Sequence, residues 1–157
     1  MILAGDIGGT KTLIGLFEPR RGRPVQVQTA SFPTTSFPGL PEILETFFDG
    51  GVVRSAITVA AFGVAGPVIN QTAEMTNVEW RVSADELKQD FAFPHVRLLN
   101  DLEATAYAVP VLDGDELTPL QPGHRQPGGN MSVVAAGTGL GGALLHRVHD
   151  RYVPVPS

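Results

Sequence analysis

Hydrophobic and polar residues in the first fifth of the chain follow the pattern of strands. An apolar run over residues 2–7 stops at two glycines, β-type residues continue over 12–18, and residues 24–32 alternate strictly between apolar and polar side chains. Alternation with a period of two is typical of half-buried strands, and a Gly-Gly pair is typical of a tight turn. We therefore predict three strands that form an antiparallel meander.

Three later segments carry the apolar spacing of helices. The first covers positions 40–48, begins near Pro41 and ends at a pair of glycines. The second begins at Ser83, which with Glu86 has the spacing of a capping box. The third has its apolar face at residues 102, 105, 106 and 109. These patterns predict three helices of two or more turns.

A continuous apolar run over residues 56–66 predicts a buried strand, and the segment VRLLN at residues 96–100 predicts a further strand between the helices. The resulting order through residue 112 is three strands followed by alternating helices and strands. Such an order predicts an α/β layer in which helices cover a mixed sheet. We expect residues 1–112 to form this small N-terminal lobe.

The remaining residues have a different pattern. Residues 113–130 are rich in proline, glycine and polar side chains, which predicts a linker or long loop. Residues 131–148 then predict a strand, a glycine turn and a second strand. A lone hairpin is marginally stable in water, so we expect residues 113–157 to be a linker and the first strands of a larger, truncated lobe.

Composition narrows the class of protein. The 157 residues are 43% hydrophobic and 17% charged, with a net charge of -5 and no cysteine. These values predict a folded soluble core, no dedicated nucleic-acid partner, and no disulfide or thiolate metal site. The N-terminus lacks a signal-peptide pattern and the longest uncharged apolar stretch is too short to span a bilayer, so we expect no membrane association.

The stretch GDIGGTKT at residues 5–12 nearly matches the Walker A pattern, but Thr10 stands where a glycine is required. A Walker A loop leads into a helix, whereas residues 12–17 have no helical face, so we predict a strand–turn–strand element. Glycine amides in such a turn can still converge on phosphate, and Asp6 beside them would then need a divalent cation such as Mg²⁺. The alternative is a plain hairpin with a solvated aspartate.

A second glycine turn lies in AAGTGLGG, residues 135–142, which contains G-x-G-x-x-G. The following residues have a strand pattern, unlike the helix of a dinucleotide-binding fold. Two strand–turn–strand glycine loops, one in each lobe, would hold a polyphosphate from both sides. The alternative for Thr138 is an ordinary turn residue.

Asn100 and Asp101 lie where a predicted strand becomes a helix. A helix N-terminus keeps a carboxylate ionised, and a base with an ordinary carboxylate pKa is adequate for phosphoryl transfer. On the residues alone, an N-cap pair is favoured over a catalytic pair.

Five motifs occur in the order and approximate spacing seen in bacterial ATP-dependent glucokinases: GDIGGTKT, FGVAGPV, MTNVEW, LLNDLEATAYAVP and AAGTGLGG. The chain resembles this family, part of the sugar kinase, Hsp70 and actin superfamily, over essentially all its length. The resemblance implies an α/β, ribonuclease-H-like (actin-like ATPase) fold with a mixed sheet and flanking helices, the second lobe incomplete. It also implies ATP-dependent phosphorylation of the glucose 6-hydroxyl, the first step of glycolysis, in the cytoplasm.

The resemblance implies a set of phosphate-binding residues. Asp6 would orient Mg²⁺ through water, while Gly8, Gly9 and Thr10 of the first glycine turn would face the β- and γ-phosphates of ATP. The residues implied in the two phosphate motifs are Gly5, Asp6, Ile7, Gly8, Gly9, Thr10, Gly137, Thr138 and Gly139.

On the sugar side, Asp101 matches the catalytic base of the family and would take the proton from the 6-hydroxyl. Asn100 would hydrogen-bond a sugar hydroxyl, and Asn77 lies in a motif near the sugar. The Glu-x-x-His sugar motif and the adenosine pocket of the family would follow Ser157. We therefore expect negligible kinase activity from residues 1–157 alone, and a homodimer for the full-length protein.

Other functions remain open on the sequence. A non-catalytic sugar or nucleotide sensor is one, although such relatives usually carry a DNA-binding segment before the first phosphate strand, which here starts at Ile2. A kinase for an N-acetylated hexose is another, and polyphosphate is an alternative donor.

Overall fold

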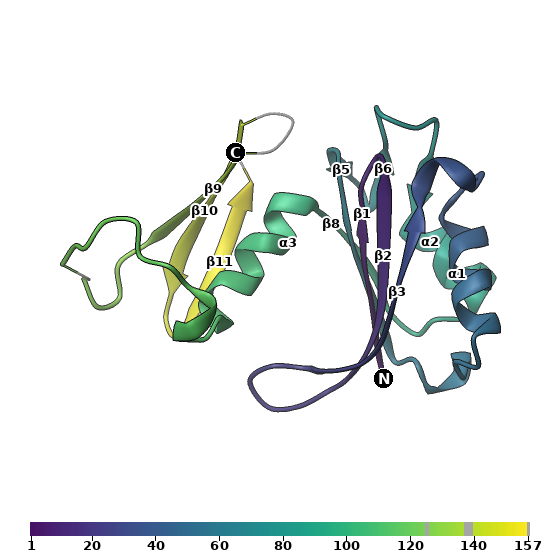
Figure 1. Ribbon diagram of the computed structural model, residues 1–157, viewed down its shortest axis with the longest axis horizontal. Helices are drawn as coiled ribbons and strands as arrows, with labels where there is room; N and C mark the ends of the chain where they lie inside the picture. Colours follow the sequence, from purple (N-terminus) through teal and green to yellow (C-terminus); the bar gives the residue numbers. More distant parts are fainter. Residues whose placement is uncertain (125, 137–139, 157) are drawn as a thin grey trace. The chain divides into compact units, whose positions relative to one another are not determined.

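The computed structural model describes residues 1–124, 126–136 and 140–156. The chain divides into two compact units, Met1–Asp101 and Leu102–Ser157 (Figure 1). The sequence placed a division after residue 112, whereas the structure groups the helix that follows Asp101 with the second unit. The reason is that Leu102 and Ala106 of this helix pack with apolar residues of the second unit's sheet.

The first unit is built on a five-stranded mixed sheet of order β3-β2-β1-β4-β8. The first three strands pair antiparallel, as the alternating pattern predicted, and β4 and β8 add in parallel to β1. The bounds of these strands are Ile2–Ile7 (β1), Lys11–Glu18 (β2), Val25–Pro33 (β3), Val59–Val64 (β4) and Val96–Asn100 (β8).

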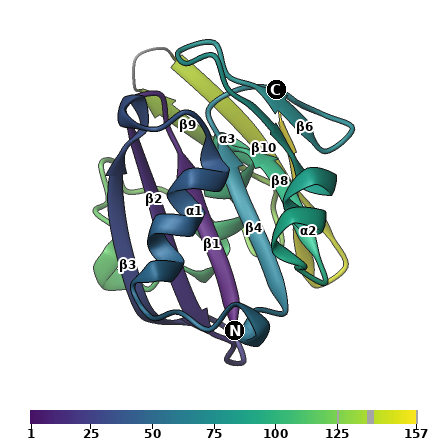
Figure 2. The same cartoon turned by 90° about the vertical axis from the view of Figure 1, so that its right-hand side faces the viewer.

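Two helices, α1 (Leu40–Asp49) and α2 (Ala84–Phe91), cover one face of this sheet (Figures 1 and 2). The predicted apolar face of α1 is buried along its whole length, with a proline in the first turn. Aromatic rings join the two helices, because Phe48 lies 5.8 Å from Phe91, which stacks on Phe93 at 5.4 Å between ring centroids. The main core of the unit therefore lies between the helices and the sheet.

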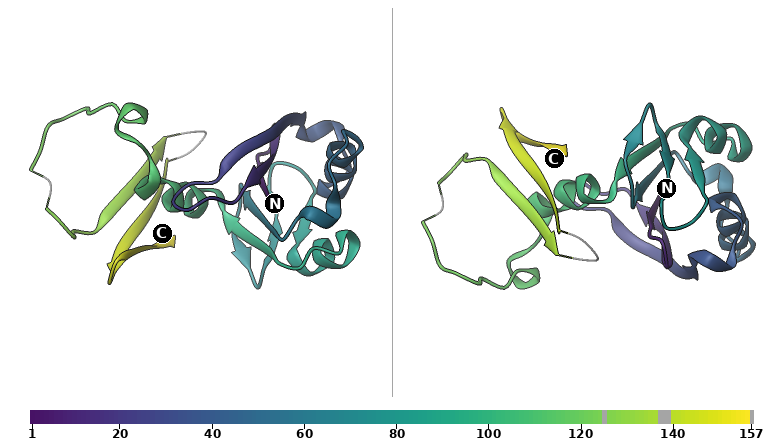
Figure 3. Two further views of the ribbon diagram at one scale, coloured as in Figure 1. Left: turned by 90° about the horizontal axis from the view of Figure 1, so that it is seen from below. Right: turned by 90° about the horizontal axis from the view of Figure 1, so that it is seen from above.

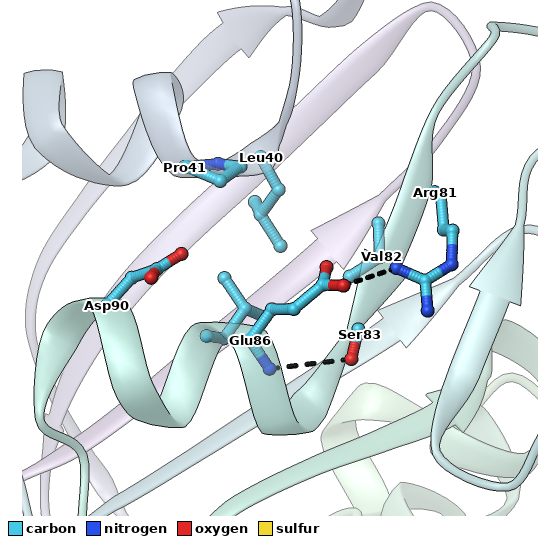
Figure 4. A pocket seen from close by; sticks show the side chains of 8 residues that line it. Leu40, Pro41, Arg81, Val82, Ser83, Glu86 and Asp90 are labelled. Carbon is cyan, nitrogen blue, oxygen red and sulfur yellow. Dashed lines mark hydrogen bonds and ion pairs between the residues drawn. The ribbon is translucent and has the colours of Figure 1, made fainter.

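The start of α2 differs in one detail from the predicted capping box. The Ser83 hydroxyl accepts a hydrogen bond from the Glu86 amide at 3.4 Å, as expected. The Glu86 carboxylate pairs with Arg81 rather than closing the box (Figure 4). The cavity beside this pair, near Leu40 and Pro41, has a volume of only about 40 Å³, which is enough for little more than a water molecule.

A small second sheet was not predicted. Its strands are β5 (Val68–Ile69), β6 (Thr72–Glu74) and β7 (Arg81–Ser83), in the order β5-β6-β7. Strands of two or three residues are too short to show a period. The turn between β5 and β6 has left-handed backbone at Asn70 and Gln71, with φ of 50° and 57°.

The second unit packs α3 (Asp101–Ala108) beside an antiparallel sheet of order β11-β10-β9 (Figure 3). Strands β9 (Met131–Ala136) and β10 (Leu140–Val148) were predicted, whereas β11 (Arg151–Pro156) was not. The buried hydrophobic cluster of this unit consists of Ala106, Ala143 and Leu145 among the described residues. No helix within the described residues is long and apolar enough to cross a bilayer.

The segment between α3 and β9 contains two short 3₁₀ helices, Val109–Val111 and Gly114–Glu116. The second has a complete capping box, in which Asp113 and Glu116 each accept from the other's backbone amide. The rest of the predicted linker has no regular structure within the described residues.

Candidate active site

The register of the parallel strands brings the acidic residues of the two motifs to one edge of the five-stranded sheet. Ile7 of β1 pairs with Val64 of β4, which pairs with Asn100 of β8. Asp6 and Asp101 therefore flank the same row at the carboxyl ends of these strands. This is the edge at which open α/β sheets bind their ligands.

The first glycine turn joins β1 to β2 at this edge. The Gly8 amide donates to the Lys11 carbonyl at 3.1 Å, and the Thr10 carbonyl accepts from the Thr34 amide at 3.0 Å. Among the described residues, no hydrogen bond uses the Gly9 or Thr10 amide. These two N–H groups are therefore available to hydrogen-bond an external acceptor.

Glycine at positions 8 and 9 is required by close contacts and not by unusual backbone angles. A Cβ at Gly8 would lie 2.9 Å from the Lys11 carbonyl oxygen, and a Cβ at Gly9 would lie 2.6 Å from the Asn77 Cβ. Neither glycine has a positive φ. The second contact shows that Asn77, from the segment between β6 and β7, lies directly against the first glycine turn.

The charge of Asp101 acts on the carboxyl group of Asp6. The Asp6 side chain is exposed at the surface, yet enough protein surrounds its carboxyl for desolvation to raise the pKa, and the negative charge of Asp101 raises the pKa further. Like charges at one edge are unfavourable unless a cation or a proton lies near them. The pair is therefore suited to a divalent cation.

The donor set fits Mg²⁺ only in combination with other ligands. The described residues contain no cluster of three or more His, Cys, Asp or Glu side chains that would hold a metal by themselves. Mg²⁺ is commonly bound by one or two carboxylates together with water and substrate phosphates. Asp6, exposed beside the glycine turn, meets that requirement.

Asn100 is held by the loop that follows β4. Its amide nitrogen donates to the Gly66 carbonyl at 3.0 Å. This contact fixes the residue before Asp101 and connects the FGVAGPV motif to the LLNDLEATAYAVP motif.

The other predicted phosphate residues have different placements. Gly5 faces the covered side of the sheet, where a Cβ would lie 2.6 Å from the Phe62 ring, and the Ile7 side chain is fully buried. Packing therefore explains the residue types at both positions. If Gly5 or Ile7 contacts phosphate, the contact must come from its backbone. Gly137, Thr138 and Gly139 lie outside the described residues.

Sequence reasoning missed two buried hydroxyls beneath the turn. Thr12 and Thr34 are both fully buried, and their hydroxyl oxygens lie 2.8 Å apart. Nothing in the sequence distinguished them from other strand and turn threonines, because their pairing depends on the β2–β3 register.

The fold and the site together define the class of protein. The sheet is mixed and begins with an antiparallel meander, helices cover one face, and a glycine turn lies beside acidic residues at the carboxyl edge. This is an N-terminal lobe of the actin-like ATPase fold, as in sugar kinases. A ROK family protein from Streptococcus pneumoniae TIGR4 shares this fold, at 22% identity and a TM-score of 0.66.

Residues 3–157 match the family described as Glucokinase, and the chain belongs to that family. It is 35% identical to a glucokinase of Nostoc sp. strain PCC 7120 over 158 aligned residues, which cover 100% of this chain and 46% of the relative. In solved structures, a glucokinase from an Antarctic psychrotroph has 30% identity and a TM-score of 0.86 over 99% of this chain and 49% of its own. The chain therefore spans about half the length of the relatives it matches.

Proposed function

We propose that the protein carrying this chain transfers the γ-phosphate of ATP to the 6-hydroxyl of glucose. The observation that supports this most is the convergence of Asp6, the Gly8–Thr10 turn and Asp101 at one sheet edge. The family assignment supplies the reaction class, and a related glucokinase from Balamuthia mandrillaris, 26% identical, was solved in complex with glucose.

In this proposal the glycine turn binds the β- and γ-phosphates through backbone amides. The Gly9 and Thr10 N–H groups bond to no acceptor among the described residues, so they are available to phosphate oxygens. Asp6 would hold Mg²⁺, and the ion would supply neutralisation of the charge on the phosphates. On the family assignment alone, Gly137, Thr138 and Gly139 are proposed as further phosphate-binding residues.

Asp101 is proposed as the base that accepts the proton of the sugar 6-hydroxyl. It is the first residue of α3 and follows Asn100 at the carboxyl edge of the sheet. Asn100, fixed by Gly66, and Asn77, beside Gly9, are proposed to contact the sugar or the transferring phosphate. On the family assignment alone, we further propose a cytoplasmic location and a homodimer for the full-length protein.

The test is Asp101→Asn in a protein that joins this chain to a C-terminal part of the length found in its relatives. Loss of the base should lower turnover by about 10²–10⁴-fold with little change in the KM for ATP. Asp90→Asn, an exposed carboxylate on α2, is the matched control and should keep the wild-type rate. A near-normal rate for Asp101→Asn, in a variant that melts like the wild type, would remove the assignment.

A further inference from the structure

Thr12 and Thr34 form a buried hydrogen-bonded pair directly beneath the phosphate turn. Thr12 lies on β2 and Thr34 begins a 3₁₀ turn, Thr34–Ser36, that follows β3. Both side chains are fully buried, and the two hydroxyl oxygens lie 2.8 Å apart. Buried hydroxyls are costly unless every group is paired, so the direction of each bond matters.

The chemistry of the acceptor fixes that direction. The Thr34 hydroxyl lies 2.8 Å from the Gly8 carbonyl oxygen, which can only accept, so Thr34 donates there. A hydroxyl has one hydrogen, and therefore the Thr12 hydroxyl must be the donor to the Thr34 oxygen. The result is a directed relay from Thr12 through Thr34 to the carbonyl of Gly8.

Thr34 also holds the other end of the turn. Its backbone amide donates to the Thr10 carbonyl at 3.0 Å. One buried residue thus binds the carbonyl groups of both Gly8 and Thr10. We call these contacts of Thr12 and Thr34 with the turn the threonine clasp.

The clasp determines where an adjacent amide points. No peptide bond in the described residues is cis. In a planar trans peptide the C=O and the following N–H point in opposite directions. Because the Gly8 carbonyl is drawn inward to Thr34, the Gly9 N–H of the same peptide is directed away from the core, towards the proposed phosphate position.

We propose that Thr34, supported by Thr12, is a positioning residue for the nucleotide phosphates. This inference rests on the proposed function, since it assumes that phosphate binds at the turn. Thr34 itself touches no phosphate; it acts by holding the Gly9 amide in one orientation, which spares the bound state the cost of ordering a flexible turn. If Thr34 served packing alone, its replacement by valine, which has nearly the same shape, would leave phosphate binding unchanged.

The experiment compares Thr34→Val, which removes the hydroxyl, with Thr34→Ser, which keeps it. In residues 1–157, ¹⁵N relaxation should give the Gly9 amide an order parameter near ~0.85 in the wild type and in Thr34→Ser, falling below ~0.6 in Thr34→Val. In the protein completed as described above, calorimetry with MgATP should show a dissociation constant about fivefold to tenfold higher for Thr34→Val, equivalent to one net hydrogen bond.

Ser83→Ala is the matched control for stability. Ser83 is a buried hydroxyl at the start of α2 that bonds the Glu86 amide and makes no hydrogen bond to the turn. Both Ser83→Ala and Thr34→Val should lower the melting temperature, but Ser83→Ala should leave the Gly9 order parameter and the affinity for MgATP unchanged.

The outcomes separate this inference from the proposed function. An unchanged Gly9 order parameter in Thr34→Val, or an unchanged MgATP affinity in spite of a mobile turn, overturns the positioning role. An equal loss of affinity in Ser83→Ala overturns it as well. If the wild type binds no MgATP, both proposals fail, whereas MgATP binding without glucose phosphorylation removes only the proposed function.

Discussion

At the scale of single residues, the ionised form of Asp6 at the carboxyl edge of the five-stranded sheet is electrostatically unfavourable. Partial burial and the neighbouring Asp101 both raise the pKa of Asp6, which means that the folded protein disfavours the ionised form. A group that is unfavourable for folding is typical of a site kept for ligand binding. The stability of the protein should therefore improve when this charge is removed.

We predict that Asp6→Asn is more stable than the wild type at neutral pH. A carboxyl whose pKa is raised by folding contributes stability while it is protonated and loses it as the pH rises through the folded-state pKa. The extra stability of Asp6→Asn over the wild type should therefore shrink as the pH falls from the raised pKa of Asp6 towards the ordinary carboxyl pKa. Below the ordinary pKa it should disappear. Thermal unfolding of both proteins over a pH series measures this.

Asp85→Asn provides the control for that series. Asp85 is an exposed carboxylate in the first turn of α2, where the helix dipole favours the charge, so its removal should be neutral or slightly destabilising. An Asp6→Asn variant that is less stable than the wild type at pH 7 would contradict the proposed electrostatics.

Sequence reasoning reached some of these residues and not others, for a physical reason. Asp6, Gly8 and Gly9 are recognisable because a glycine turn after an apolar strand has a local signature. Thr34 is not, because its role depends on the register between β2 and β3, which places it against a turn 26 residues earlier. The close approach of Asn77 to Gly9 is equally non-local.

At the scale of elements, β8 is an edge strand of the sheet, and a single side chain covers part of that edge. The Gln71 side chain accepts from the Leu98 amide at 2.9 Å and donates to the Leu98 carbonyl at 3.3 Å, in the manner of a neighbouring strand. Pairing an exposed edge in this way protects a sheet from unwanted strand addition. It also connects the small β5-β6-β7 sheet to the strand that ends at Asn100.

We predict that Gln71→Ala lowers the free energy of unfolding by about 1–2 kcal/mol, the net value of two hydrogen bonds. Asn70→Ala is the control, since Asn70 has the same left-handed backbone and no hydrogen bond from its side chain among the described residues. Denaturant unfolding of the two variants separates the hydrogen bonds from the backbone effect. Equal destabilisation by both substitutions would show that the edge contact contributes nothing.

Elements long enough to show a period were predicted well. The three meander strands, the faces of α1 and α2, and β8 follow directly from apolar spacing. The strand β11 was not predicted; it contains prolines such as Pro154, and it is the outer strand of a three-stranded sheet, where proline is tolerated. The small β5-β6-β7 sheet was missed because its strands are too short.

At the scale of the whole molecule, each unit has a sheet face that none of its described elements covers. The five-stranded sheet has a hollow of about 430 Å³ on this face, lined mostly by small or apolar residues such as Ala4, Gly15 and Phe17, with Asp6, Gln26 and Thr29 as the polar members. The three-stranded sheet exposes Val134 and Leu144, with 69% and 51% of their surface accessible. Apolar sheet faces of this kind are normally covered, which is the basis for expecting residues 1–157 to associate.

The most direct test of the account is a crystal structure of the completed protein with glucose and Mg²⁺·ADP. We predict that an Asp101 carboxylate oxygen lies within about 2.6–3.2 Å of the glucose 6-hydroxyl, the reach of a general base. We also predict that the terminal phosphate accepts from the Gly9 amide, with Asp6 beside the metal. A 6-hydroxyl that faces a different acid, or phosphates bound away from the Gly8–Thr10 turn, would contradict the account.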